Sequence, residues 1–182
     1  MTESKTRLPK NIELVPDGEA LVIRRTWRSG PSYFLIAFSL FWDLFIVVWF
    51  TAAIREEEWG TLAFGMIHLL FGLGISYLTL AYFLNKTDIR IDTNNLTISH
   101  APIPWSGTYV QANSEIDQLH SKERVHQRNN MKTYYYDLVS RDKSGTDKKL
   151  LIGLTDKNQA LYLEKEIEKT LGIKNRTIEG QI

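Results

Sequence analysis

The chain has 182 residues and a formal net charge of +1, from 22 basic and 21 acidic side chains. This length suits one ordinary domain with a small addition, and the balanced charge supplies no global field that would recruit nucleic acid. The absence of cysteine excludes disulfides, thiolate catalysis and cysteine-ligated zinc or iron–sulfur sites.

The N-terminal part is predicted to be a polar tail followed by two strands. Residues 1–10 have no apolar core of a signal peptide, and we expect them to form a disordered tail. Residues 11–28 alternate apolar and polar side chains around the turn Pro16-Asp17-Gly18, and they are predicted to be the first two strands of a β domain.

Two long apolar segments follow, at 32–54 and 59–84, joined by the short linker REEEWG. At about 1.5 Å per residue, each is long enough to cross a hydrocarbon layer of about 30 Å. The alternative is a pair of buried helices in a soluble core, but a domain of this size has too little remaining chain to surround them. We therefore predict a transmembrane helical hairpin over 32–84.

The charges that flank these segments predict how the hairpin is oriented. The basic residues near its two ends are Arg24, Arg25, Arg28, Lys86 and Arg90. The connecting loop instead carries three consecutive glutamates and one arginine. The positive-inside rule then places both termini in the cytoplasm and the acidic loop outside.

Small and polar residues form a seam along the two segments. On the first, Ser39 and Asp43 share a stripe; on the second, steps of three and four residues align Gly65, His68, Gly72, Ser76 and Thr79. An unpaired charge in mid-membrane is costly, so we expect Asp43 to be neutral, paired or turned toward protein, with His68 as one conceivable partner. We favour a polar lock that holds the hairpin or docks a partner subunit; a proton or ion relay is the alternative.

After the hairpin, short segments rich in Ile, Val, Thr and Tyr predict antiparallel strands, about seven or eight in the whole chain. Hairpin turns are expected at Asn94-Asn95, Asn129-Asn130 and Lys143-Ser144-Gly145. Helical spacing then predicts a helix over 156–171 with Thr155 as its N-cap, and residues 174–182 are expected to be a flexible tail. The predicted fold is an α+β membrane protein, in which a two-helix hairpin is inserted into an antiparallel β-barrel or sandwich capped by a C-terminal helix.

Several stretches carry a resemblance to a known family: RRTW, RIDTNNLTISHAPIPW, SEIDQLHSKERV and LLIGLTDKNQALYLEKEIEKTLGI. With the apolar hairpin, they resemble an uncharacterised family of bacterial two-span membrane proteins over about residues 18–173. The resemblance implies a pleckstrin-homology-like (PH-like) cytoplasmic domain, completed by residues 87–173. A weaker likeness, in architecture only, is to the photosystem I assembly factors of thylakoids. These likenesses imply a bacterial inner membrane or a thylakoid-like membrane, and they assign no activity.

One candidate binding surface is a row of basic residues. Lys122, Arg124, His126 and Arg128 occupy every second position and project from one face of a strand, with Lys132 close by across the turn. Such a stripe attracts anionic lipid headgroups, at about 1 kcal/mol per Lys or Arg, as basic loops of PH-like domains do. The alternative, which we favour, is a solvated edge strand whose charges prevent aggregation.

Trp105 lies in the rigid segment APIPWSG and is expected either to pack under the barrel or to contact the bilayer or a partner. The sequence contains no phosphate-binding glycine loop and no histidine pair with the spacing of a metal motif. We therefore expect a non-enzymatic membrane scaffold or assembly protein without cofactor or metal. Its expected partners are membrane lipids and other membrane subunits, not nucleic acid. The alternative is a membrane-anchored module that binds anionic headgroups through the basic stripe.

Overall fold

The computed structural model describes residues 8–174, 176 and 182. Over these residues the chain has an α+β architecture with eight strands, two long apolar helices and a C-terminal helix. It divides into two compact units. The β unit comprises the chain up to residue 25, residues 87–100 and the chain from residue 106, and the helical unit comprises residues 26–86 and 101–105. Most of the two predicted tails, 1–10 and 174–182, lies outside the described residues.

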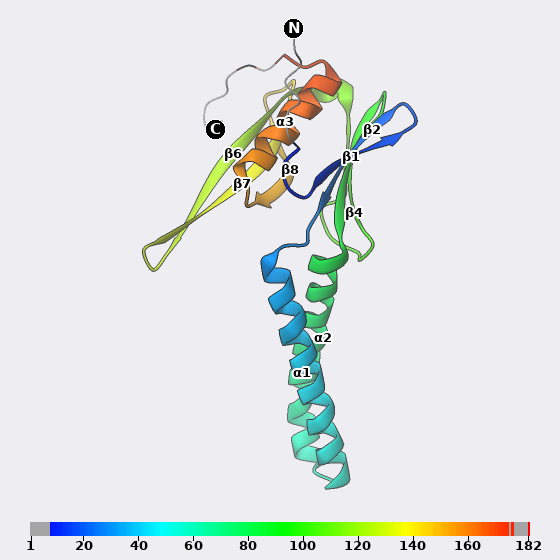
Figure 1. Cartoon of the computed structure of the whole chain (residues 1–182), viewed down its shortest axis with the longest axis vertical. Helices are drawn as coiled ribbons and strands as arrows, with labels where there is room; N and C mark the ends of the chain where they lie inside the picture. Colours follow the sequence, from blue (N-terminus) through cyan, green and yellow to red (C-terminus); the bar gives the residue numbers. More distant parts are fainter. Residues whose placement is uncertain (1–7, 175, 177–181) are drawn as a thin grey trace. The chain divides into compact units, whose positions relative to one another are not determined.

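The strands form two separate antiparallel sheets (Figure 1). The five-stranded sheet has the order β1 (Ile12–Asp17), β2 (Ala20–Thr26), β3 (Lys86–Ile91), β4 (Asn95–Ala101) and β5 (Tyr109–Ala112). After a short 3₁₀ turn (Asn113–Glu115), the three-stranded sheet has the order β6 (Ile116–Arg128), β7 (Met131–Asp142) and β8 (Asp147–Leu154). The chain thus leaves the first sheet from β2, makes the helix pair and returns into β3, its neighbour in the same sheet.

Local sequence explains the turns. Asn129 and Asn130 both have positive φ, 46° and 60°, and form the two-residue connection between β6 and β7 that was expected there. Gly18, with φ 61°, lies in the connection between β1 and β2. Pro16 is not a turn residue but belongs to β1, which is tolerated because β1 is an edge strand and the missing N–H breaks no ladder.

Both sheets and the C-terminal helix α3 (Lys157–Leu171) share one apolar core. Its fully buried side chains come from all three elements: Ile23, Ile89, Leu96, Ile98, Leu119, Leu138, Leu154, Leu163 and Ile167. The N-cap of α3 is Asp156, one residue after the predicted Thr155, because Asp156 keeps an extended backbone and accepts a hydrogen bond from the Asn158 N–H at 2.9 Å. Gly172 ends the helix in the left-handed conformation, with φ 68°.

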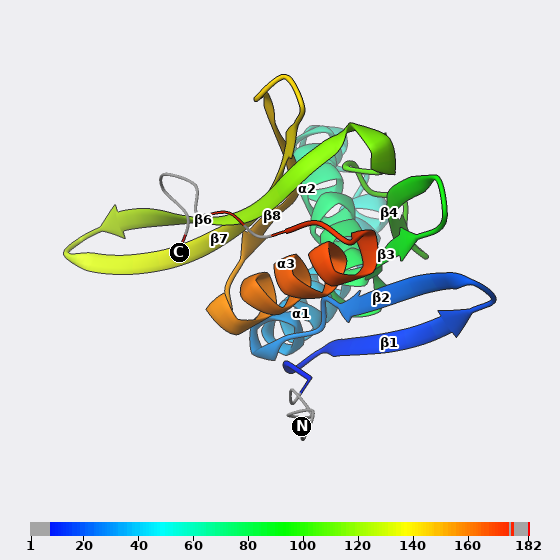
Figure 2. The same ribbon diagram turned by 90° about the horizontal axis from the view of Figure 1, so that it is seen from above.

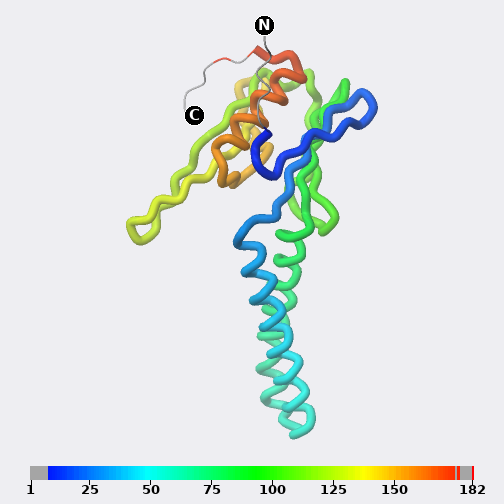
Figure 3. The backbone as a smooth tube through the Cα atoms, in the orientation of Figure 1, coloured from blue at the N-terminus to red at the C-terminus, as the bar shows by residue number. Residues whose placement is uncertain are grey.

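The helical unit is built on α1 (Gly30–Arg55) and α2 (Trp59–Leu84), which run side by side in Figures 1 and 3. Two glycines let the helices approach closely. A Cβ added to Gly65 would lie 2.8 Å from the Phe50 ring, and one added to Gly72 would lie 2.8 Å from the Trp42 ring. Larger residues at these positions would force the two helices apart.

Both helices are long and apolar enough to span a membrane. Little of their apolar surface is covered by the rest of the chain: 11% of the most apolar window of α1 is buried, and 17% of that of α2. A helix in the core of a soluble protein is mostly buried, so the chain by itself leaves this surface without a cover.

Candidate functional site

Polar groups gather in two places, one between the long helices and the other on the three-stranded sheet. The first is a polar site around Asp43, near the middle of α1. The Ser76 hydroxyl donates to Asp43 Oδ2 at 2.8 Å, and the Ser39 hydroxyl lies 2.9 Å from that of Ser76 and 3.5 Å from Asp43 Oδ2. Ser39 reaches the site because it precedes Asp43 by one helical turn. The arrangement binds a carboxylate with hydroxyl groups from both helices.

His68 lies away from this site. Its ring packs against Trp42, Trp49 and Phe64, with centroid distances of 6.1, 5.1 and 4.9 Å, and Trp42 Nε1 donates to the His68 carbonyl at 3.2 Å. Trp42 and Asp43 are consecutive, so they project about 100° apart around α1. The Asp43–His68 contact considered from the sequence is therefore not formed, because the two side chains lie on opposite flanks of the helix pair.

The other seam residues pack the two helices together. Gly65, Gly72 and Thr79 are buried, and the Thr79 hydroxyl donates to the Leu35 carbonyl at 3.4 Å. The predicted seam on α2 thus separates into a buried line of small residues, Ser76 on one flank and His68 on the other.

The second place is the face of β6, β7 and β8 that points away from the core, which we call the charged face. It is defined by the residues Lys122, Arg124, His126, Arg128, Asp137, Arg141, Asp147 and Lys149. Two aspartates pair with most of its cations. Asp137 is bound by Arg124 at 2.7 Å and Lys149 at 3.2 Å, and Asp147 is bound by Lys122 at 2.6 Å and Arg141 at 2.7 Å.

These pairings set the protonation of both aspartates. Burial alone would raise the pKa of Asp137, but hydrogen bonds from Arg124, the Gly153 N–H and Lys149 outweigh it and hold the pKa below its ordinary value. The hydrogen bond from Arg141 is the largest of several effects that depress the pKa of Asp147. Both carboxylates are therefore charged at neutral pH and neutralise part of the basic stripe.

Sequence reasoning missed four members of the charged face: Asp137, Arg141, Asp147 and Lys149. Alternation along β7 places Asp137 and Arg141 on the same side of their strand, and this much could have been predicted from the sequence. The contacts of the missed residues with Lys122 and Arg124 could not have been predicted, because they depend on strand register and on bulges between β7 and β8.

Beyond the end of β8, the hairpin of β6 and β7 continues as a two-stranded arm, residues 124–135 (Figures 2 and 3). All of these residues are exposed except Tyr135, which is half-buried. An open hollow of about 500 Å³ on the arm is lined by Arg124, Val125, His126 and Tyr135. Lys132 pairs in register with Gln127, so it projects from the opposite side of the arm to His126 and Arg128 rather than extending their stripe.

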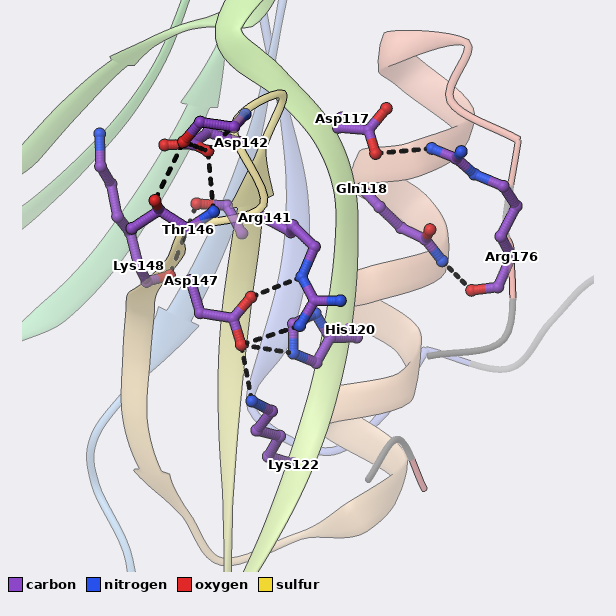
Figure 4. Close-up of polar contacts among 12 residues, drawn as sticks. Asp117, Gln118, His120, Lys122, Arg141, Asp142, Thr146, Asp147, Lys148 and Arg176 are labelled. Atoms are coloured by element: carbon purple, nitrogen blue, oxygen red, sulfur yellow. Dashed lines mark hydrogen bonds and ion pairs between the residues drawn. The ribbon is translucent and has the colours of Figure 1, made fainter. Parts of the chain in front are cut away.

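His120 lies in the buried part of β6, at the opposite end of that strand from the arm (Figure 4). Its Nε2 is 3.5 Å from Asp147 Oδ2, and burial lowers the pKa of the imidazole, so the ring is neutral at pH 7. In the described part of the chain, no three His, Asp or Glu side chains come together in a way that would hold a metal ion.

Trp105 belongs to the helical unit. Its ring packs on Trp27, Tyr82 and Tyr77, with centroid distances of 5.2, 5.9 and 6.5 Å. Its segment is bound to the end of α2, since the Asn85 amide donates to the Ile103 carbonyl at 2.9 Å and accepts from the Ile103 N–H at 2.7 Å. Trp105 therefore joins an aromatic cluster at one end of the helix pair.

No family model matches the chain, and no curated protein matches it either.

Proposed function

We propose that the chain is a non-catalytic integral membrane scaffold, anchored by α1 and α2 and presenting the β unit to partner subunits in the cytoplasm. The observation that carries the proposal is the uncovered apolar surface of the two helices. Large side chains such as Phe34, Leu40 and Ile67 are 71%, 66% and 66% exposed. Water would make this surface strongly unfavourable, whereas lipid hydrocarbon would cover it on all sides.

The aromatic cluster supports insertion at a defined depth. Trp27, Tyr82 and Trp105 gather at one end of the pair, and Arg28 lies 4.0 Å over the Phe83 ring at the same end. Amphipathic rings and cations of this kind are typical of the membrane–water interface. Trp59 lies at the far end of the pair and is 74% exposed.

Chain connectivity supports a common side for both ends of the hairpin. Because α1 follows β2 and α2 precedes β3, and these strands are neighbours in one sheet, the chain must cross the bilayer an even number of times between them. The positive-inside rule assigns this side to the cytoplasm. The resemblance described above points to a bacterial inner membrane or a thylakoid-like membrane. Arg24 also pairs with Asp88 in the folded β unit, at 2.7 Å, so it serves both insertion and folding.

A PH-like classification of the β unit belongs to the same proposal. It is supported by two antiparallel sheets that share one core and by a C-terminal helix that covers it. One contact between a hydroxyl group and a histidine in the β unit is unsuited to catalysis. Thr87 lies 3.0 Å from His100 Nδ1, but Thr87 is only 1% exposed and no substrate can reach it.

The absence of cysteine makes topology directly testable. Single cysteines at Glu57, in the loop between the helices, and at Ser144, in the β unit, can be labelled with a membrane-impermeant maleimide in intact cells. In intact cells we expect Glu57→Cys to be labelled and Ser144→Cys to remain unlabelled. After permeabilisation we expect Ser144→Cys to be labelled as well. Labelling of Ser144→Cys in intact cells, or extraction of the chain by alkaline carbonate, would refute the membrane topology.

The scaffold role has its own test. Purification in several mild detergents, after crosslinking in native membranes, is expected to yield other membrane subunits in a fixed ratio to the chain. Recovery of the chain alone under all these conditions would count against a scaffold.

The second candidate, binding of anionic lipid headgroups, is favoured by the cations at the end of the arm. Arg128 and Lys132 are exposed and have no ion pair within the described part of the chain, whereas Lys122 and Arg124 are engaged by aspartates. Flotation of the full chain is uninformative because the helices bind lipid themselves. Salt-sensitive attraction is instead measured as the rate at which detergent-solubilised chain associates with vesicles of anionic lipid.

For this test, Arg128→Gln with Lys132→Gln is compared with Lys157→Gln and Lys165→Gln, which remove the same charge from the exposed side of α3. Loss of salt-sensitive association in the arm variant alone would favour headgroup binding. Equal effects of the two pairs would dismiss it.

A further inference from the structure

The Asp43 carboxylate lies at the middle of a 26-residue apolar helix. At about 1.5 Å per residue, it is about 18 Å from either end of α1. The side chain of aspartate is too short to carry its charge to the headgroup region from that depth. If the helix pair spans a bilayer, Asp43 therefore sits near the midplane, where an unpaired charge is costly.

The chain satisfies only one side of this carboxylate. Oδ2 accepts the hydrogen bond from Ser76 and faces Ser39, whereas no described residue donates to Oδ1. Oδ1 lies on the Gly72 side of the carboxylate, 3.5 Å from the place where that glycine would carry a Cβ. Asp43 itself is exposed on the surface of the helix pair. One carboxylate oxygen of an exposed residue is thus left without a donor from the described part of the chain.

The surroundings of Asp43 are apolar and uncovered. Leu40 and Val47 lie one turn to either side of it on α1, and they are 66% and 61% exposed. Leu73 and Leu80 lie one turn to either side of Ser76 on α2, and they are 59% and 50% exposed. A polar centre with an aliphatic surround matches the way in which a transmembrane helix docks through one polar contact.

Charge determines what kind of helix fits. Between Gly30 and Leu84 the only basic side chains are Arg55, at the end of α1, and His68, on the opposite flank. The helix pair therefore has no cation of its own for Oδ1. A second copy docking through the same flank would bring carboxylate against carboxylate, which is unfavourable.

We propose that the flank formed by Asp43, Ser76, Leu40, Val47, Leu73 and Leu80 binds a transmembrane helix of another protein, and that this helix carries a lysine or arginine at mid-membrane depth that pairs with Asp43 Oδ1. The proposal rests on the membrane-scaffold function above and names the chemistry of the docked partner. In the proposed complex the pair is shielded from water, and each charge offsets part of the cost of placing the other in hydrocarbon.

The test is site-specific photocrosslinking of the full chain in native membranes. A photoreactive amino acid replaces Leu73, on the proposed flank, or Leu78, which projects about 140° away on the same helix. The crosslinked peptide is identified by mass spectrometry. We expect the adduct at position 73 to be an apolar segment of another protein that contains a lysine or arginine, with little adduct at position 78.

Asp43→Asn is expected to reduce this adduct by about tenfold, because the amide keeps size and hydrogen bonding but loses the charge, while Asp43→Glu retains most of it. Adducts to a second copy or to lipid alone would overturn the proposal. So would equal crosslinking at positions 73 and 78, or an adduct indifferent to Asp43→Asn. Extraction by alkaline carbonate is measured on the same membranes. If carbonate extracts the unsubstituted chain, the membrane anchor is refuted. If the chain resists extraction but gives one of the contradicting adducts, only the proposed partner is refuted.

Discussion

Substitution of Gly72 by alanine tests the packing that holds the helix pair together. The added Cβ would lie 2.8 Å from Trp42 Cδ1 and 3.0 Å from its Nε1, distances that side chains in folded proteins do not tolerate. Trp42 has little freedom to withdraw, because its Nε1 donates to the His68 carbonyl at 3.2 Å and its ring meets the edge of Phe71 at 5.2 Å. We expect the variant either to lose that hydrogen bond or to separate the helices.

The matched control is Gly74→Ala, two residues along the same helix, where an added Cβ meets nothing within 4 Å. Both substitutions gain the helix propensity of alanine, so the difference between them isolates the clash. Overpacking of this kind costs about 1–3 kcal/mol, and we expect Gly72→Ala to be less stable than Gly74→Ala by that amount.

The assay follows from the distribution of tryptophan. All five tryptophans belong to the helical unit, so their fluorescence reports on the helix pair without a signal from the β unit. Reversible unfolding of the full chain in mixed micelles, titrated with SDS, gives the two free energies. Free energies of the two variants that agree within about 0.5 kcal/mol would refute the packing described for Gly72.

Four further outcomes are expected. In the cysteine-free chain, the pair Ser39→Cys and Ser76→Cys should oxidise to an intramolecular disulfide, because the two hydroxyls are 2.9 Å apart, whereas Leu40→Cys with Ser76→Cys should remain open to maleimide. Asp137→Asn should lower the free energy of unfolding of the β unit, measured by hydrogen exchange, by about 1–3 kcal/mol at neutral pH, since it leaves Arg124 and Lys149 without their anion. Because the pKa of Asp137 is depressed in the folded state, this difference should be complete above pH of about 4 and shrink below it. His120 is buried with a lowered pKa, so protonation of the unfolded chain below pH of about 6.5 should destabilise the fold; a chain with His120→Gln that lost as much stability between pH 7.5 and 5.5 as the unsubstituted chain would contradict this. Gly172→Ala should cost about 1 kcal/mol because φ is 68° there, while Gly172→Asn should cost less, as judged by the melting temperature of the β unit.

Local features of the structure follow from the sequence because they depend on neighbours within a few residues. The two apolar segments form α1 and α2, Asn129-Asn130 makes the turn between β6 and β7, and Gly172 ends the last helix. Errors at this level were small and also local. Pro16 lies in an edge strand instead of a turn, and the cap of α3 moved from Thr155 to Asp156.

Which side chains meet across elements was decided only by the tertiary structure. The rotation of α1 against α2 turns Asp43 toward Ser76 and away from His68, and a period of 3.6 residues does not reveal which flank faces the partner. Strand register likewise brings Asp137 to Arg124 and sends Lys132 to the other side of the arm. A sequence contains the periodicity of each element, but the phase between two elements is set by the packing of both, and a shift of one residue in a strand reverses every side chain on it.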